Sequence, residues 1–229
     1  MVEMKPLDQC QLYAFVDASY LGSSSPESVT EELCEGGADL VQFRAKNLSQ
    51  EEILQIARRL LPITERAGVG LVINDYPQIA LRLGAQACHL GQEDFFGGGD
   101  AHCSALLPPK SDLKIGLSSH RPEQAIRCVA SGADYVAVGP VFPTRTKPLA
   151  APVTLEYVRW AARHLSLPWF AIGGITLENL DDVVKAGARR ICVVSAILRS
   201  PDIVMACRSF KDRLLSGARA NKPSKTTTG

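Results

Sequence analysis

The sequence predicts an α/β fold, a single (β/α)8 TIM barrel over residues 1–215, followed by a disordered tail over residues 216–229. Three observations favour this fold. Short hydrophobic runs alternate with longer segments of helical period, the alternation repeats eight times in about 200 residues, and a glycine motif recurs before every second run. Strict alternation of strand and helix requires crossover connections, so the strands are expected to be parallel.

The hydrophobic runs have the length of strands and are apolar at most positions, which is typical of parallel strands buried on both faces. In chain order they are Gln11–Asp17, Leu40–Arg44, Gly70–Asn74, Ala87–Leu90, Leu113–Leu117, Tyr135–Gly139, Trp169–Ile172 and Ile191–Val194.

Amphipathic segments lie between the runs and predict helices. The last of the clear ones begins with Thr176, a residue type that is favoured at helix N-caps. The clearest segments are Gln50–Ala67, Arg121–Ser131, Thr154–Leu165 and Thr176–Ala186. Two regions do not follow the alternation: Phe95–Asp100, a glycine-rich segment expected to be a mobile loop, and the polar tail that begins at Ser216.

A doubly wound open sheet is the competing architecture for such an alternation, and the glycine motif decides between the two. Gly37, Gly84, Gly132 and Gly187 are each followed by alanine and precede the second, fourth, sixth and eighth runs. Glycine adopts the left-handed conformation after a helix without steric cost. A fourfold repeat of this kind favours a closed barrel over a sheet with a reversal point.

Composition excludes several classes of protein. With 25 Lys+Arg and 24 Asp+Glu the formal net charge is +1, so we expect no nucleic-acid partner. No apolar stretch approaches 20 residues and Met1–Cys10 lacks an apolar signal core, so we expect neither a membrane partner nor secretion. Seven cysteines without a CxxC pair indicate reduced thiols in a cytoplasmic protein rather than a zinc site. The sequence is compatible with a homo-oligomer and does not assign an oligomeric state.

Polar residues follow most of the predicted strands at their carboxyl ends, where the active sites of such barrels lie. We therefore expect them to meet at one rim, although they are distant in sequence. These segments are residues 42–46, 74–75, 89–94, 118–120, 139–147, 173–174 and 194–195.

Acidic and basic residues at this rim predict a magnesium-bound diphosphate. Asp75 and Asp94 end neighbouring units, and two carboxylates with open positions suit Mg²⁺, which completes its shell with water and substrate phosphates. Arg44, Lys46 and Lys147 are cations that suit a polyanionic leaving group.

A second anion site is predicted at Gly173-Gly174, where side-chain-free backbone precedes a helix, with Val194-Ser195 opposite. Neutral hydrogen bonds to a heterocycle or to phosphate are available from Gln42, Asn74, Ser118, Thr144 and Thr146, whereas Arg145 can equally face solvent. His89 and His120 are expected to be structural. Spacing assigns no nucleophile–base pair, which favours electrostatic stabilisation of a departing diphosphate.

Taken together, these motifs resemble the thiamine phosphate synthase (thiamine-phosphate pyrophosphorylase) family, in order, from about residue 11 to residue 200. The motifs are Gln42–Lys46, Ile73–Asp75, His89–Asp94, Gly132–Val136, Gly139–Thr144 with Lys147, and Ala171–Thr176. The resemblance implies a transferase that joins a hydroxymethylpyrimidine diphosphate to a thiazole phosphate, giving thiamine phosphate and diphosphate. It also implies a dissociative reaction, in which the bond to diphosphate breaks before the thiazole nitrogen attacks.

The resemblance implies roles for individual residues. Ser118, Lys147 and Arg44 are expected to be catalytic, and Asp75 and Asp94 to hold Mg²⁺. Substrate contacts are expected from Gln42, Phe43, Arg44, Ala45, Lys46, Asn74, Ser118, Thr144, Arg145, Thr146, Lys147, Gly174, Val194 and Ser195. Ala45 departs from the family, which usually has an acidic residue there. On a strand, residue 45 faces away from its neighbours, so the change should affect packing more than catalysis.

Two alternatives remain. A thiazole tautomerase-like relative shares the fold, but that branch is expected to carry a histidine where this chain has Pro140. A non-catalytic regulatory binder of thiamine intermediates is the other alternative. The complete set of charged residues argues against it, because unpaired charges gathered in a pocket are costly without a ligand.

Overall fold

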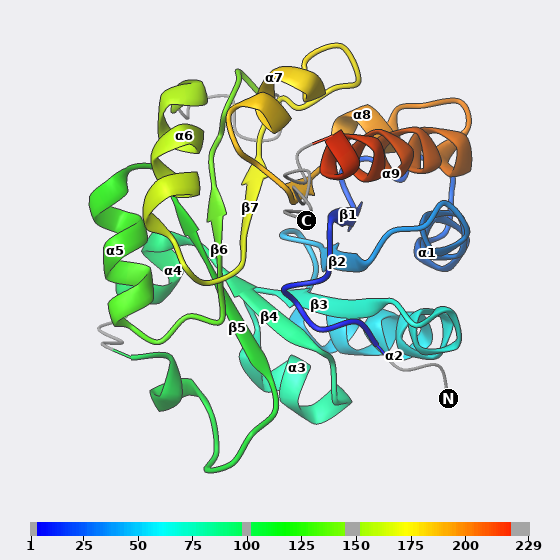
Figure 1. The fold of residues 1–229 in the computed structure, drawn as a ribbon. Helices are drawn as coiled ribbons and strands as arrows, with labels where there is room; N and C mark the ends of the chain where they lie inside the picture. The colour runs from blue at the N-terminus through cyan, green and yellow to red at the C-terminus, as the bar shows by residue number, and fades with distance from the viewer. Residues whose placement is uncertain (1–3, 98–101, 145–151, 221–229) are drawn as a thin grey trace, which may run out of the picture.

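The computed structural model describes residues 4–97, 102–144 and 152–220, without the side chains of 217–220. Eight parallel strands close into a barrel in the order β1 to β8 (Figure 1). The strands are β1 (Leu12–Asp17), β2 (Leu40–Arg44), β3 (Gly70–Asn74), β4 (Ala87–Leu90), β5 (Lys114–Ser119), β6 (Tyr135–Val138), β7 (Trp169–Ile172) and β8 (Ile191–Cys192). This arrangement confirms the predicted (β/α)8 barrel.

Helices surround the barrel, with α1, α2 and α9 on one side and α5 and α6 on the other in Figure 1. Their bounds are α1 (Pro26–Glu35), α2 (Gln50–Ala67), α3 (Pro77–Leu83), α4 (Gln92–Phe96), the 3₁₀ turn η1 (Cys103–Leu106), α5 (Pro122–Ala130), α6 (Thr154–His164), α7 (Leu180–Lys185), α8 (Ser195–Leu198) and α9 (Ile203–Ala220). No helix in the described ranges is long and apolar enough to cross a membrane.

Local sequence signals fix several of these boundaries. Helix α2 begins where predicted because Ser49 and Glu52 form a reciprocal capping box. Gly37, Gly84, Gly132 and Gly187 all have positive φ, between 70° and 107°, which confirms their predicted left-handed conformation.

Three of the predicted boundaries differ most clearly from the structure. Helix α7 begins at Leu180 rather than at Thr176, because Asn179 Oδ1 accepts a hydrogen bond from Thr176 N and holds residues 177–179 as a turn. The loop expected from Phe95 starts later, because Phe95 lies in α4 and is fully buried, while residues 98–101 are outside the described ranges. The backbone of residues 216–220 continues α9, so the tail does not begin at residue 216, and 221–229 are not described.

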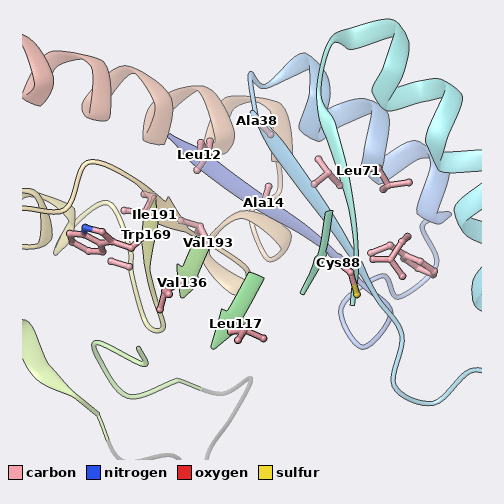
Figure 2. Close-up of a cluster of buried hydrophobic side chains, with 14 of the residues drawn as sticks. Leu12, Ala14, Ala38, Leu71, Cys88, Leu117, Val136, Trp169, Ile191 and Val193 are labelled. Carbon is pink, nitrogen blue, oxygen red and sulfur yellow. The ribbon is translucent and has the colours of Figure 1, made fainter. Parts of the chain in front are cut away.

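Two cores result from the alternation of side chains along the strands. Between barrel and helices lies the larger core, part of which Figure 2 shows. Inside the barrel lies a second cluster, in which the rings of Tyr13, Tyr135 and Phe170 pack edge to face with centroids 5.4 to 6.1 Å apart. This inner cluster fills the barrel below the carboxyl ends of the strands, so a ligand can approach the strands from above it.

The cysteine side chains are mostly buried in the core. All seven lie in described positions, six of them are buried, and none forms a disulfide.

Candidate active site

A cavity of about 900 Å³, part of it open to solvent, lies at the carboxyl ends of the strands. The residues predicted to bind substrate or metal that line it are Gln42, Arg44, Lys46, Asn74, Asp75, Asp94, Ser118, Thr144, Gly174 and Val194. Chain-distant segments therefore meet at one place, as the barrel requires. Arg145, Thr146 and Lys147 lie outside the described residues.

Strand alternation separates the residues that end β2. Gln42, Arg44 and Lys46 line the cavity, whereas Phe43 and Ala45 are 1% and 5% exposed and belong to the core beneath the helices. The predicted substrate contacts of Phe43 and Ala45 therefore do not come from their side chains. Ala45, directly after β2, packs in that core, as the alternation along the strand predicts.

Asp75 stands at the end of β3 in a left-handed conformation, with φ of 66°. Its backbone N–H donates to the carbonyl of His89 over 2.9 Å, and its Oδ2 lies 3.2 Å from Lys46 Nζ. Burial raises the pKa of the Asp75 carboxyl, the nearby Lys46 ammonium lowers it and the charge of Asp94 raises it again. The two carboxylates thus lie near enough to repel each other.

Asp94 reaches the cavity from the first turn of α4. Its carboxylate lies over the backbone of Gly91, where a Cβ would be 2.5 Å from Asp94 Oδ2. Two carboxylates of like charge facing one cavity form a set of oxygen donors that suits Mg²⁺. Among the described residues no group of three or more His, Cys, Asp or Glu gathers to hold a metal, so water and substrate would supply the remaining ligands.

Across the barrel from Asp75, the backbone of Gly173 and Gly174 lines the cavity after β7, which lies four strands from β3 in the closed sheet. Both have positive φ, 101° and 65°. A Cβ at Gly174 would lie 2.6 Å from the Pro143 carbonyl oxygen, so only glycine fits. Asn179 Nδ2 donates to the Gly174 carbonyl over 2.9 Å and fixes the turn, so the two glycines present bare backbone to the cavity.

The segment Val194-Ser195, which was predicted to complete this anion site, contributes less to the cavity wall than expected. Val194 lines the cavity, but the adjoining Ser195 does not, and α8 is only four residues long. A contact from Ser195 to a bound phosphate therefore stays a prediction.

The structure also places a histidine where sequence reasoning expected none to act. His89 Nε2 lies 2.9 Å from Ser118 Oγ, a pairing that spacing in the sequence did not assign. Both side chains line the cavity. The signal was partly present, because alternation along β4 points Ala87 and His89 inward. The register of β4 against β5, which pairs His89 with Gly116, is not readable from one sequence.

Asp17 was also missed. Its carboxylate is 1% exposed and accepts from Arg44 Nη1 over 2.7 Å. His120, expected to be structural, lines the cavity while its Nδ1 lies 2.5 Å from the Gly139 carbonyl oxygen.

Comparisons with known proteins point to one family. Residues 12–197 match the family described as thiamine monophosphate synthase. A thiamine-phosphate synthase of Thermus thermophilus is 44% identical over 191 residues, which span 81% of this chain and 87% of the relative. That of Shouchella clausii is 36% identical over 208 residues, 90% and 96% of the two chains. A solved thiamine phosphate pyrophosphorylase from Pyrococcus furiosus superposes with a TM-score of 0.81 at 28% identity, covering 92% of this chain and 98% of its own.

Proposed function

Because the chain belongs to the thiamine monophosphate synthase family, we propose that its cavity joins a pyrimidine diphosphate to a thiazole phosphate. The chain is an enzyme of thiamine biosynthesis, a transferase that forms thiamine phosphate. The observation that carries the assignment to this cavity is the opposition of two features in it. A carboxylate pair with basic neighbours lies on one side and a glycine wall on the other.

The diphosphate belongs on the side of Asp75, Asp94 and Lys46. Bound there, Mg²⁺ would neutralise charge on the leaving diphosphate. Arg44 retains guanidinium N–H groups beyond the one that pairs with Asp17, and these can donate to phosphate oxygens. The Ser118 hydroxyl on the same wall can donate to an oxygen of the breaking C–O bond.

The thiazole phosphate belongs on the side of Gly173, Gly174 and Val194, where bare backbone can approach its oxygens. Thr144 lies at this edge of the cavity, and Thr146 is assigned here by its motif alone, whereas the motif of Lys147 assigns that residue to the diphosphate. Holding the two substrates face to face replaces a collision in solution with an oriented reaction. A dissociative mechanism suits such a site, because its groups stabilise the departing anion.

The alternatives are less well supported. A tautomerase would not need the carboxylate pair, and Pro140 follows Gly139 where that branch is expected to have a histidine. A regulatory binder would not need Ser118 and His89 hydrogen-bonded at the cavity wall.

We also place the reaction in the cytoplasm, since seven thiols without a disulfide suit a reducing compartment.

A product assay tests the function. The purified chain is mixed with both phosphorylated precursors and Mg²⁺, and thiamine phosphate and diphosphate are quantified over time. Formation of both in equal amounts, lost when either precursor is omitted or a chelator is added, supports the proposal. Absence of thiamine phosphate from a folded chain with both precursors and Mg²⁺ contradicts it.

A further inference from the structure

An unbroken chain of hydrogen bonds runs through the interior of the barrel between two cavity residues. It starts at Gln42 on β2, whose Nε2 donates to Tyr13 OH over 2.5 Å. Tyr13 OH lies 3.1 Å from Tyr135 OH, and Tyr135 OH lies 3.2 Å from His89 Nδ1. His89 Nε2 then lies 2.9 Å from Ser118 Oγ, on the cavity wall.

Both tyrosine hydroxyls are sealed from solvent. Tyr13 and Tyr135 are 1% and 0% exposed, and their rings pack against Phe170 in the inner cluster. Burial raises the pKa of both phenols well above the usual value, so each carries its proton. Neither phenol lines the cavity, so neither belongs to the substrate-binding set described above.

Because each phenol has one proton to donate, the donors and acceptors along these hydrogen bonds follow one order. Tyr13 accepts from the Gln42 amide, so its own proton goes to Tyr135, whose proton then goes to His89 Nδ1. A neutral imidazole that accepts at Nδ1 is protonated at Nε2, so His89 donates to Ser118 Oγ. The Ser118 hydroxyl proton is therefore left to point into the cavity.

If the donors and acceptors were reversed, Ser118 and His89 would have a different chemical role. If Nε2 of His89 accepted the Ser118 proton, the pair would be a nucleophile and its base. The amide hydrogen bond of Gln42 opposes that arrangement from β2, three hydrogen bonds away from the imidazole.

We infer that Tyr135 is a positioning residue: its buried hydroxyl holds His89 in the Nε2-protonated form, so that Ser118 serves as a hydrogen-bond donor to the ligand and not as a nucleophile. The inference rests on the proposed function for the identity of that ligand, a diphosphate ester. The tautomer itself does not depend on it.

Nitrogen NMR of the histidine side chains measures the tautomer without any substrate. His89 is assigned by the signal that disappears in His89→Gln, at a pH where imidazoles are neutral. The wild-type chain should give the Nε2-protonated pattern for His89. Tyr135→Phe should shift it toward a mixture of tautomers, because Nδ1 loses its donor. Tyr157→Phe is the matched control. It removes another buried phenol, which donates to Ser119 Oγ over 2.7 Å and takes no part in the hydrogen bonds that run from Gln42 to Ser118.

An Nδ1-protonated His89 in the wild-type chain would overturn the inference, and this result needs no variant to fold. An unchanged tautomer in folded Tyr135→Phe would overturn it equally. A wild-type chain that shows the expected tautomer but makes no thiamine phosphate would contradict the proposed function alone.

Kinetics provide a second test in the active enzyme. Tyr135→Phe should lower kcat about tenfold, with smaller changes in both KM values, because the orientation of one hydrogen bond in the transition state is lost. In a Ser118→Ala background the same substitution should have no further effect, since it acts through Ser118. A full effect in that background would assign Tyr135 a merely structural role and overturn the inference.

Discussion

Arg44 Nη1 lies 2.7 Å from Oδ2 of Asp17, a carboxylate that is 1% exposed at the end of the neighbouring strand. Asp17 also accepts from the backbone N–H and the hydroxyl of Ser19, at 3.0 and 2.6 Å. The pair is set by the register of β1 on β2, which places Asp17 beside Arg44. Asp17 therefore fixes one edge of the guanidinium and leaves the others directed to the cavity.

Asp17→Asn should weaken binding of the pyrimidine diphosphate. The amide keeps the shape of the carboxylate but loses its charge, so Arg44 is held less firmly. We expect the KM for the diphosphate substrate to rise about tenfold and that for the thiazole phosphate to stay nearly constant. Asp181→Asn, which breaks the exposed pair with Arg213, is the control and should change neither value. Equal increases of both KM values would argue against a specific role for Asp17.

Asp94→Ala should abolish Mg²⁺-dependent turnover while the fold survives, because Asp94 is an exposed residue at the cavity rim. We expect kcat/KM to fall by at least about a hundredfold at fixed Mg²⁺. Glu93→Ala removes an equally exposed carboxylate one residue away and should be nearly silent. Near-normal activity of Asp94→Ala would remove the metal assignment.

Gly91→Ala should perturb the metal site without touching a proposed ligand. Gly91 has φ of −70°, which alanine tolerates, but the new methyl would lie 2.5 Å from Asp94 Oδ2 and displace that carboxylate. The Mg²⁺ concentration for half-maximal activity should rise, with the melting temperature almost unchanged. If the Mg²⁺ dependence stays at its wild-type value, the position inferred for the Asp94 carboxylate is incorrect.

Gly174→Ala should raise the KM for the thiazole phosphate selectively. The substitution strains a left-handed residue and drives a methyl toward the Pro143 carbonyl, which deforms the glycine wall. Gly22→Ala is a matched control, since Gly22 has φ of 56° with open space around it. Both variants should lose about 1 kcal/mol from backbone strain, Gly174→Ala should lose more because its methyl meets the Pro143 carbonyl, and only Gly174→Ala should change substrate affinity. Unchanged KM values in both would place the phosphate elsewhere.

Asp39 should make the barrel sensitive to acid. Its carboxylate joins Lys211 of α9 to Lys5 and to the backbone N–H groups of Gln11 and Leu12. Burial raises its pKa, but the two lysines and the backbone donors outweigh burial and hold the pKa below its ordinary value. A lowered folded-state pKa stabilises the fold above the unfolded-state value of about 4, and the contribution disappears as pH falls through the folded-state pKa.

Asp39→Asn should therefore lower the free energy of unfolding by about 3 to 5 kcal/mol at pH 7, and the difference should shrink below about pH 4. Denaturant unfolding of both chains across this range measures it. A difference that is constant with pH would exclude the charge of Asp39 as the cause.

Most of the fold could be predicted because hydrophobic alternation and glycine positions are local signals. β2, β3, β4, β7 and α2 begin and end where the sequence indicates. β8 did not, since it pairs for only two residues before Val193 and Val194 turn toward the cavity. The start of α7 was predicted too early, because Asn179, and not Thr176, is the residue that precedes the helix, and its side chain accepts a hydrogen bond from Thr176 N.

The placement of Asp75 and Asp94 at the cavity could be predicted, because Asp75 directly follows β3 and Asp94 follows β4 after a short turn. Partnerships across strands could not, because they depend on register: Asp17 with Arg44, and His89 with Ser118, are separated by 27 and 29 residues. Tyr13 and Tyr135 lie in two of the predicted buried strands, and their rings pack in the inner cluster. Their hydroxyls matter only because the closed barrel brings residues 122 apart within 3.1 Å.

A crystal structure with thiamine phosphate, diphosphate and Mg²⁺ bound would test the central claim most directly. The account predicts a Mg²⁺ ion about 2.1 Å from oxygens of both Asp75 and Asp94, bridging to diphosphate, with the product phosphate against the backbone of Gly173 and Gly174. Diphosphate bound away from the Asp75–Asp94 pair, or both phosphate groups on one side of the cavity, would contradict it.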